Sequence, residues 1–198
     1  METHSPQKLY AYVDESGQDT LGELFVVATV LTADNHERVR QSLERLERVS
    51  GKGLRKWIKA TPRQRLAYLT AVLQLPALHG RLFAAHFTHT TTYLPCVLTT
   101  ITQAVTAGAG GQPSRATVLI DGLQKTVRQD VAAALRVQLQ PHHIRVEKVR
   151  GLDEESDALM RLADAMAGFV RHALEGRPAL APLLAESQRQ GVIRLLQT

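Results

Sequence analysis

Two adjacent carboxylates follow a segment near the start of the chain that is typical of a β-strand. The segment is 10–13 (YAYV), and Asp14 and Glu15 come next, before the pair Ser16-Gly17. Tyrosine and valine favour strands, and a Ser-Gly pair favours a turn. A carboxylate at the end of a strand is held by the sheet and faces the space beyond it, where rigid oxygens can bind Mg²⁺. The sequence therefore predicts a metal site here, with a simple polar turn as the alternative.

Further carboxylates follow or lie on later predicted elements. Asp121 comes directly after the apolar strand 117–120, and Gly122 allows the chain to turn sharply there. Asp157 and Asp164 lie on a strongly periodic helix near the end of the chain, seven residues apart. Seven residues make about two helical turns, so the two side chains share a helix face about 10 Å apart along the axis. A sheet-based site could collect these carboxylates.

Several carboxylates repel one another unless a divalent cation or a proton neutralises them. Mg²⁺ or Mn²⁺ does so, and two such ions can flank the in-line attack of water on a phosphodiester without a Ser, Cys or His nucleophile. We therefore predict a metal-dependent nuclease, a hydrolase of DNA or RNA. The predicted catalytic residues are Asp14, Glu15, Asp121 and Asp164. The predicted metal ligands are Asp14, Asp121 and Asp164, with Asp157 or Glu15 as a fourth ligand or base.

Each of the later acids also has a simpler interpretation. Asp121 with Gly122 is typical of an ordinary turn. Asp157 and Asp164 could form ion pairs with Arg161, which falls between them on the same helix face.

Positive charge is concentrated in one segment. The net charge of the chain is +5, but residues 38–65 hold ten Lys or Arg and two Glu. Such a segment suits the phosphate backbone of a nucleic acid, although it could also be a solvated, Arg-rich helix face. Its single Trp could stack on a base between flanking cations, or be a core residue with cationic neighbours. The predicted nucleic-acid contacts are Arg55, Lys56, Trp57, Lys59 and Arg161.

Composition limits the class of protein. A chain of 198 residues with 44% apolar residues is typical of one globular domain. The single cysteine excludes an internal disulfide. Residues 1–8 are polar and no apolar run approaches the roughly 18 residues of a membrane helix, so we expect a cytoplasmic protein with no membrane partner. The expected partner is nucleic acid, and the sequence leaves a homodimer open.

The predicted elements alternate in a pattern typical of an α/β fold. The first two strands are close enough for a hairpin, and helices and strands alternate after them, which favours a five-stranded mixed sheet with helices on both faces. We predict one domain over 1–198, with a core at about 9–174 and a C-terminal extension at 175–198 that the pattern does not place. The predicted strands are 10–13, 24–31, 81–88, 117–120 and 144–149. The predicted helices are 35–49, 62–73, 94–107, 126–139 and a last one from about 157.

Three motifs in this order resemble a bacterial and phage family, domain of unknown function 3800. The motifs are YVDESG at 12–17, VLIDG at 118–122 and LADAMAG at 162–168. The resemblance spans about 9–174 and implies a ribonuclease H-like fold with Asp14, Asp121 and Asp164 at metal-binding positions. The family usually has Gln where this chain has Arg161. That Arg could weaken metal binding by pairing with a neighbouring Asp, or it could contact the scissile phosphate.

Two further functions stay open alongside the nuclease. One is a non-catalytic nucleic-acid-binding or scaffold protein that retains the fold, and the other is a metal-dependent phosphatase that acts on small molecules. Stabilisation by Mg²⁺ would separate the first from the nuclease, and salt-sensitive binding of nucleic acid would separate the second.

Overall fold

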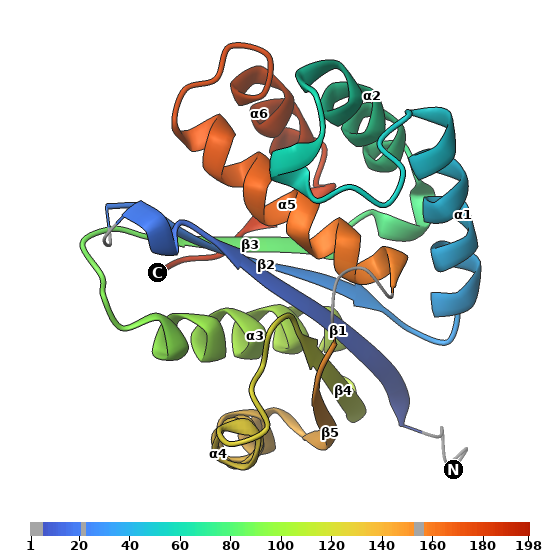
Figure 1. The fold of residues 1–198 in the computed structure, drawn as a ribbon. Coiled ribbons are helices and arrows are strands. Elements are labelled where there is room, and N and C mark those ends of the chain that lie inside the picture. Colours follow the sequence, from blue (N-terminus) through green and yellow to red (C-terminus); the bar gives the residue numbers. More distant parts are fainter. Residues whose placement is uncertain (1–5, 21–22, 153–156) are drawn as a thin grey trace.

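A six-stranded mixed sheet forms the centre of the protein, here described from a computed structural model that covers residues 6–20, 23–152 and 157–198 (Figure 1). The strands lie in the order β5-β4-β1-β2-β3-β6. Their bounds are β1 (Gln7–Ser16), β2 (Phe25–Thr32), β3 (Leu82–Phe87), β4 (Ser114–Ile120), β5 (Ile144–Gly151) and β6 (Ile193–Leu195).

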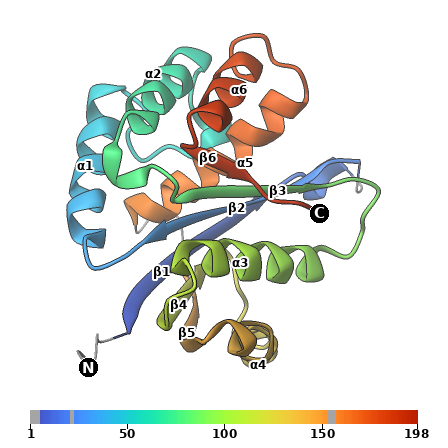
Figure 2. The same ribbon diagram turned by 180° about the vertical axis from the view of Figure 1, so that it is seen from behind.

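Helices cover both faces of the sheet, as the sequence predicts. Helices α1, α2, α5 and α6 lie on one side, and α3 and α4 lie on the other (Figures 1 and 2). Their bounds are α1 (His36–Val49), α2 (Pro62–Leu73), α3 (Tyr93–Ala109), α4 (Arg128–Leu139), α5 (Ala158–Leu174) and α6 (Ala181–Arg189). Short one-turn helices are η1 (Gln18–Thr20), η2 (Trp57–Lys59), η3 (Pro76–Leu78) and η4 (Gln140–His142). Within the described residues, no helix is both long and apolar enough to cross a membrane.

The sheet is mixed because β1 pairs with strands of both directions. β1 is antiparallel to β2, in the predicted hairpin, and parallel to β4. All eight residues of β2 are buried, since helices pack on both of its faces. The α/β class with a mixed sheet and helices on both faces is therefore confirmed.

The strand count differs from the prediction by one. β6, within the segment expected to be an extension, pairs in parallel with β3 and places Ile193 opposite Leu82. It is only three residues long, too short for the alternation that identifies a strand in a sequence. The C-terminal segment thus completes one edge of the sheet rather than extending beyond the core.

Alternate residues of β1 enter two separate apolar cores. Ala11 and Val13 join the core beneath α3, whereas Tyr12 joins the core beneath α5. Side chains two residues apart in a strand point to the same face. Asp14 therefore faces the α5 side of the sheet, as Tyr12 does.

Candidate carboxylate site

Two neighbouring strands place Asp14 and Asp121 side by side. Asp14 lies within β1, which continues to Ser16 instead of ending at Val13 as predicted, and Asp121 directly follows β4. β1 and β4 are parallel, with Val13 opposite Ile120. The residue that follows each of them in the sequence is an aspartate. The backbone N–H of Asp121 donates to the carbonyl oxygen of Val13 at 3.0 Å, which keeps the pairing in register at this point. Two carboxylates that the sequence separates by more than a hundred residues thus become neighbours.

The third aspartate comes from the helix that covers this face. Asp164 lies on α5, which packs across β1 and β2. The residues around it are small (Ala163, Ala165 and Ala167), and all three are buried. Small side chains let a helix approach a sheet closely. The structure thus places Asp164 within electrostatic range of Asp14, as the motif LADAMAG predicts.

Burial and neighbouring charges raise the pKa values of two acids of this group. The Asp14 side chain is buried, and burial raises its pKa to about 9, with the charges of Asp121, Asp164 and Glu15 adding to the rise. One interaction opposes it, because the backbone N–H of Glu15 donates to Asp14 Oδ1 at 2.7 Å. Burial, with the charge of Asp121, also raises the pKa of Glu15 to about 6. A proton or a cation must therefore accompany these acids near neutral pH.

The donor types fit a hard divalent cation, but the side chains are not gathered into a formed metal site. Carboxylate oxygens are the ligands that Mg²⁺ prefers, and a doubly charged ion would relieve the repulsion around Asp14. Among residues 6–20, 23–152 and 157–198, no group of three or more Asp, Glu, His or Cys side chains is close enough to hold a metal ion. The three aspartates are therefore close enough for Asp121 and Asp164 to raise the pKa of Asp14, but as they stand they do not form a group that could hold an ion.

The loop between α1 and α2 contacts Asp164 directly. The backbone N–H of Trp57, at the start of η2, donates to Asp164 Oδ2 at 2.6 Å. The Trp57 ring lies against Gly168, where an added Cβ would come within 2.1 Å of it. Its Nε1 donates to His172 Nδ1 at 3.1 Å, and Arg65 Nε donates to its carbonyl oxygen at 2.8 Å. Sequence reasoning missed this contact, although the glycine one turn beyond Asp164 indicates a close approach.

Asp157 does not join the group. Its Oδ1 accepts the backbone N–H of Leu159 at 2.8 Å, which makes it the N-cap of α5. Its Oδ2 pairs with Arg40 at 2.9 Å. Both carboxylate oxygens are thus held at the helix end, and the structure does not support the prediction of a metal-binding Asp157.

Arg161 is buried instead of facing a nucleic acid. Its Nε and Nη2 donate to the two carboxylate oxygens of Glu47 at 2.7 and 2.8 Å. Lys52, also buried, has its Nζ 3.8 Å from the same carboxylate. The prediction that Arg161 contacts a phosphate is therefore wrong in this structure. Sequence reasoning counted Glu47 only as one of the two acids of the basic segment and so missed its pairing with Arg161 on another helix.

The basic segment is divided between the surface and the core. Trp57 is buried, so the prediction that it stacks on a base is wrong and the alternative of a core Trp is confirmed. Arg55, Lys56 and Lys59 are exposed on either side of it. Since Trp57 contacts Asp164, these three cations lie on the loop that borders the carboxylates.

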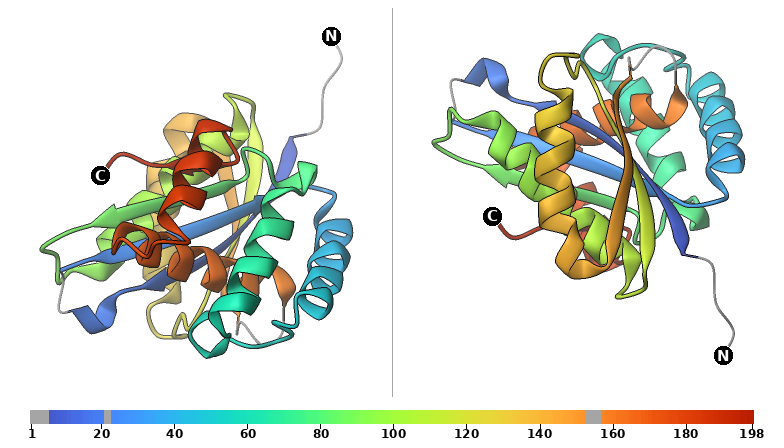
Figure 3. Two further views of the ribbon diagram at one scale, coloured as in Figure 1. Left: turned by 90° about the horizontal axis from the view of Figure 1, so that it is seen from above. Right: turned by 90° about the horizontal axis from the view of Figure 1, so that it is seen from below.

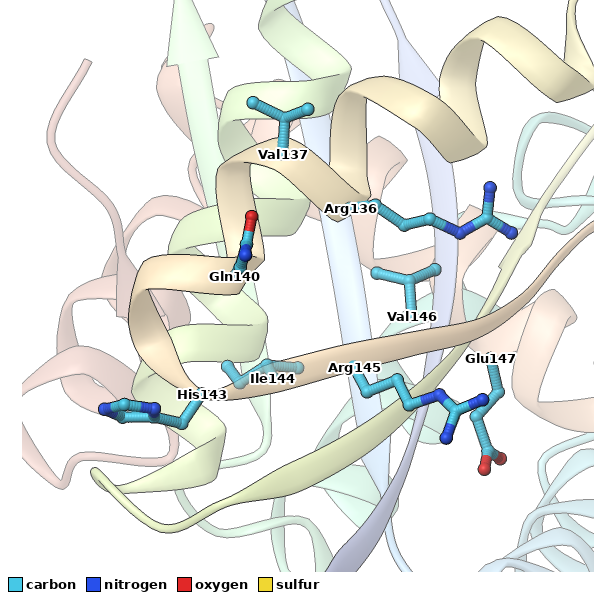
Figure 4. Close-up of a pocket in the computed structure, with 8 residues that line it drawn as sticks. All are labelled: Arg136, Val137, Gln140, His143, Ile144, Arg145, Val146 and Glu147. Atoms are coloured by element: carbon cyan, nitrogen blue, oxygen red, sulfur yellow. The ribbon is translucent and has the colours of Figure 1, made fainter.

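One cavity in the described part of the chain lies elsewhere. It has a volume of about 660 Å³ and lies between α4 and β5 (Figure 4). Its lining includes Arg136, Val137, His143 and Arg145, and none of the predicted site residues.

Two solved structures share the arrangement of strands and helices. The structure of the PCNA:RNase HII complex from Archaeoglobus fulgidus matches with a TM-score of 0.51 and 14% identity, over 94% of this chain and 91% of that chain. The ribonuclease H2 structure from Pyrococcus horikoshii OT3 matches with a TM-score of 0.51 and 13% identity, over 81% and 70%. The fold is ribonuclease H-like. Comparisons with protein-family models and with curated proteins find no match.

Proposed function

We propose that this protein is a divalent-metal-dependent nuclease that hydrolyses phosphodiester bonds of DNA or RNA. The observation that carries the proposal is the placement of Asp121 and Asp164 beside a buried Asp14, whose pKa they help to raise to about 9. Three acids on β1, β4 and α5, one of them buried with a raised pKa, suit a site built for a cation. The ribonuclease H-like fold supports the same interpretation.

Each residue of the proposed site would have its own role. Asp14, Asp121 and Asp164 would hold Mg²⁺ or Mn²⁺, which when bound supplies charge stabilisation and an activated water. Glu15 can accept a proton near neutral pH, because its pKa is raised to about 6. Gln18 Nε2 donates to Glu15 Oε1 at 2.9 Å and orients that carboxylate.

The exposed cations beside the site would hold the nucleic acid. Arg55 donates to the carbonyl oxygens of Gly51 and Lys52, which shapes the loop, and Lys56 and Lys59 flank the buried Trp57. Contacts to phosphates are sequence-independent and weaken as salt rises. We expect affinity for nucleic acid to fall with ionic strength, and to fall less steeply when Lys56 and Lys59 are both changed to Gln.

Cleavage of labelled substrates tests the proposal. Single-stranded DNA, duplex DNA, RNA and RNA–DNA hybrid are incubated with Mn²⁺, with Mg²⁺ or with EDTA. We expect metal-dependent products that Asp14→Asn abolishes and that Asp130→Asn retains, because Asp130 is exposed on α4 on the other face of the sheet. Full activity in Asp14→Asn would refute the assignment.

A second candidate function is a non-catalytic nucleic-acid-binding or scaffold protein with the same fold. It is favoured by one observation, namely that the described carboxylates are not gathered closely enough to hold an ion. It predicts salt-sensitive binding of nucleic acid with no products in any metal. Membership in the domain of unknown function 3800 family, the homodimer and the cytoplasmic location stay predictions.

A further inference from the structure

A second cavity, of about 450 Å³, lies at the start of α2 and against the segment that joins α5 to α6. Helices α2 and α6 lie in front of α5 in the left view of Figure 3. Apolar and basic side chains line the cavity together. The apolar lining residues used below are Leu66 and Leu180, and the basic lining residues are Arg63, Arg65, His172 and Arg177.

The sequence pattern gives Leu66 a different place from the one the structure shows. With Leu69 and Leu73, it forms a stripe at helical spacing that predicts a core position. Leu69 and Leu73 are buried, but Leu66 is 39% exposed and lines the cavity. A large apolar side chain kept at the surface within a hollow is typical of a binding site.

Arg65 and Arg177 are close enough to affect each other, and among the described residues that line the cavity there is no carboxylate. Burial and the charge of Arg177 lower the pKa of Arg65, against the opposing charge of Asp164. The nearest acid on the adjoining helix end, Glu175, pairs with Arg171 at 2.9 Å. An anion in the cavity would relieve this repulsion.

Arg65 is held so that part of its guanidinium can serve a ligand. Its Nε donates to the carbonyl oxygen of Trp57 and its Nη2 to that of Ile58, both at 2.8 Å. A guanidinium has five N–H donors, so these two contacts leave donors for a bidentate anion such as a phosphate. The side chain is thus oriented by the loop before any ligand arrives.

We propose that this cavity is a nucleotide-binding subsite, where Arg65 and Arg177 hold the phosphate and Leu66 and Leu180 contact the base or sugar. Inorganic phosphate alone would make no contact with Leu66 and Leu180. A purely apolar ligand would form no ion pair with the guanidinium groups of Arg65 and Arg177. A phosphorylated nucleoside satisfies both, and the volume lies in the usual range for small-ligand sites.

The nucleotide can come from two sources. His172 lies eight residues after Asp164 on α5, about 12 Å along the helix axis, so a strand at the carboxylates could also reach the cavity. A free mononucleotide is the other source. The strand-bound form rests on the proposed nuclease function, whereas binding of a nucleotide does not.

Trp57 provides a direct signal of binding, because it is the only tryptophan of the chain. Its ring lies 5.0 Å from the Arg65 guanidinium, and its Nε1 donates to His172. Both partners line the cavity. A ligand that contacts them changes the surroundings of the indole and therefore its emission.

The experiment titrates adenosine monophosphate, adenosine, inorganic phosphate and a tetranucleotide into the full chain in EDTA, and follows Trp57 fluorescence. We expect saturable binding of the monophosphate, with adenosine and phosphate each at least about tenfold weaker, since each lacks one half of the contacts. Arg177→Gln and Leu66→Ser should each weaken monophosphate binding about tenfold. Arg145→Gln, in the cavity of Figure 4, should leave binding unchanged.

The tetranucleotide separates the two sources. Tighter, Arg177-dependent binding of the tetranucleotide assigns the cavity to a strand, and equal binding assigns it to free nucleotides. The proposal is overturned if adenosine binds as tightly as the monophosphate, or if neither fluorescence nor equilibrium dialysis detects saturable binding. Because the titration needs no metal and no cleavage, loss of the nuclease function alone would leave this result intact.

Discussion

Replacing Asp14 by Asn should make the metal-free protein more stable, although it removes a side chain assigned to the site. The pKa of Asp14 is raised to about 9 in the folded chain, so the folded protein carries a proton there at pH 7 that the unfolded chain has lost. Asn is neutral at every pH and has nearly the same shape. Its side-chain oxygen can still accept the N–H of Glu15, so the substitution removes the charge penalty without removing that contact.

The size of the effect follows from the two pKa values. The pH of 7 lies about three units above the pKa of an ordinary aspartate, and each unit corresponds to about 1.4 kcal/mol. The penalty is therefore at most about 4 kcal/mol, and about half of that is expected once the surroundings of the charged group relax. For a chain of this size, about 2 kcal/mol raises Tm by about 4–8 °C.

The pH dependence has a definite sign. Since the folded pKa of Asp14 lies above the unfolded value, its contribution to stability is fully present below about pH 4 and is lost as pH rises towards 9. Wild-type stability should therefore fall across this window more steeply than that of Asp14→Asn. Glu15 also titrates in part of the window, but it is present in both proteins, so the difference between them isolates Asp14.

The assay is thermal unfolding in EDTA at several pH values from 5 to 9, followed by circular dichroism. Asp130→Asn is the matched control, because Asp130 is exposed and lies on the other face of the sheet. It should follow the wild-type curve. An Asp14→Asn protein that melts at or below the wild-type Tm, with the same pH slope, would refute the reasoning that Asp14 is buried among like charges.

Three further predictions concern the metal, the buried ion pair and the helix glycine. Mg²⁺ or Mn²⁺ should raise the Tm of the wild type but not of Asp14→Asn, since an ion that binds only the folded state stabilises it by mass action; equal shifts in both would contradict the site. Arg161→Met should lower stability to chemical denaturation by about 3 kcal/mol, because it removes both hydrogen bonds to the buried Glu47; a loss near zero would contradict this. Gly168→Ala should destabilise by about 1–3 kcal/mol and shift Trp57 fluorescence, because the new Cβ would lie 2.1 Å from the indole; an unchanged spectrum would contradict that contact.

The sequence predicts the fold well because its strands carry strong local signals. β2 is apolar along its whole length, and α5 has a clear stripe of buried residues, so both are visible without the structure. β6 is not, since three residues carry no periodicity. The pairing of β1 with β4 depends on contacts between distant residues, and the sequence did not predict it.

The candidate site was predictable in part for the same reason. Asp121 directly follows an apolar strand, and Asp14 follows the β-prone segment 10–13, so the local sequence marks both positions even though β1 continues to Ser16. The partners of Arg161 and Asp157 were not visible, because Glu47 and Arg40 lie on α1, more than a hundred residues away. Charge counts describe a segment, but they do not tell which of its side chains the fold buries.

The most direct test of the central claim is single-turnover cleavage by the wild type and by three separate variants, Asp14→Asn, Asp121→Asn and Asp164→Asn, each shown to be folded by circular dichroism. The account predicts Mn²⁺-dependent cleavage that each substitution lowers by about a thousandfold or more, since metal-assisted stabilisation is worth several kcal/mol. Cleavage that persists in all three variants, or in EDTA, would contradict it.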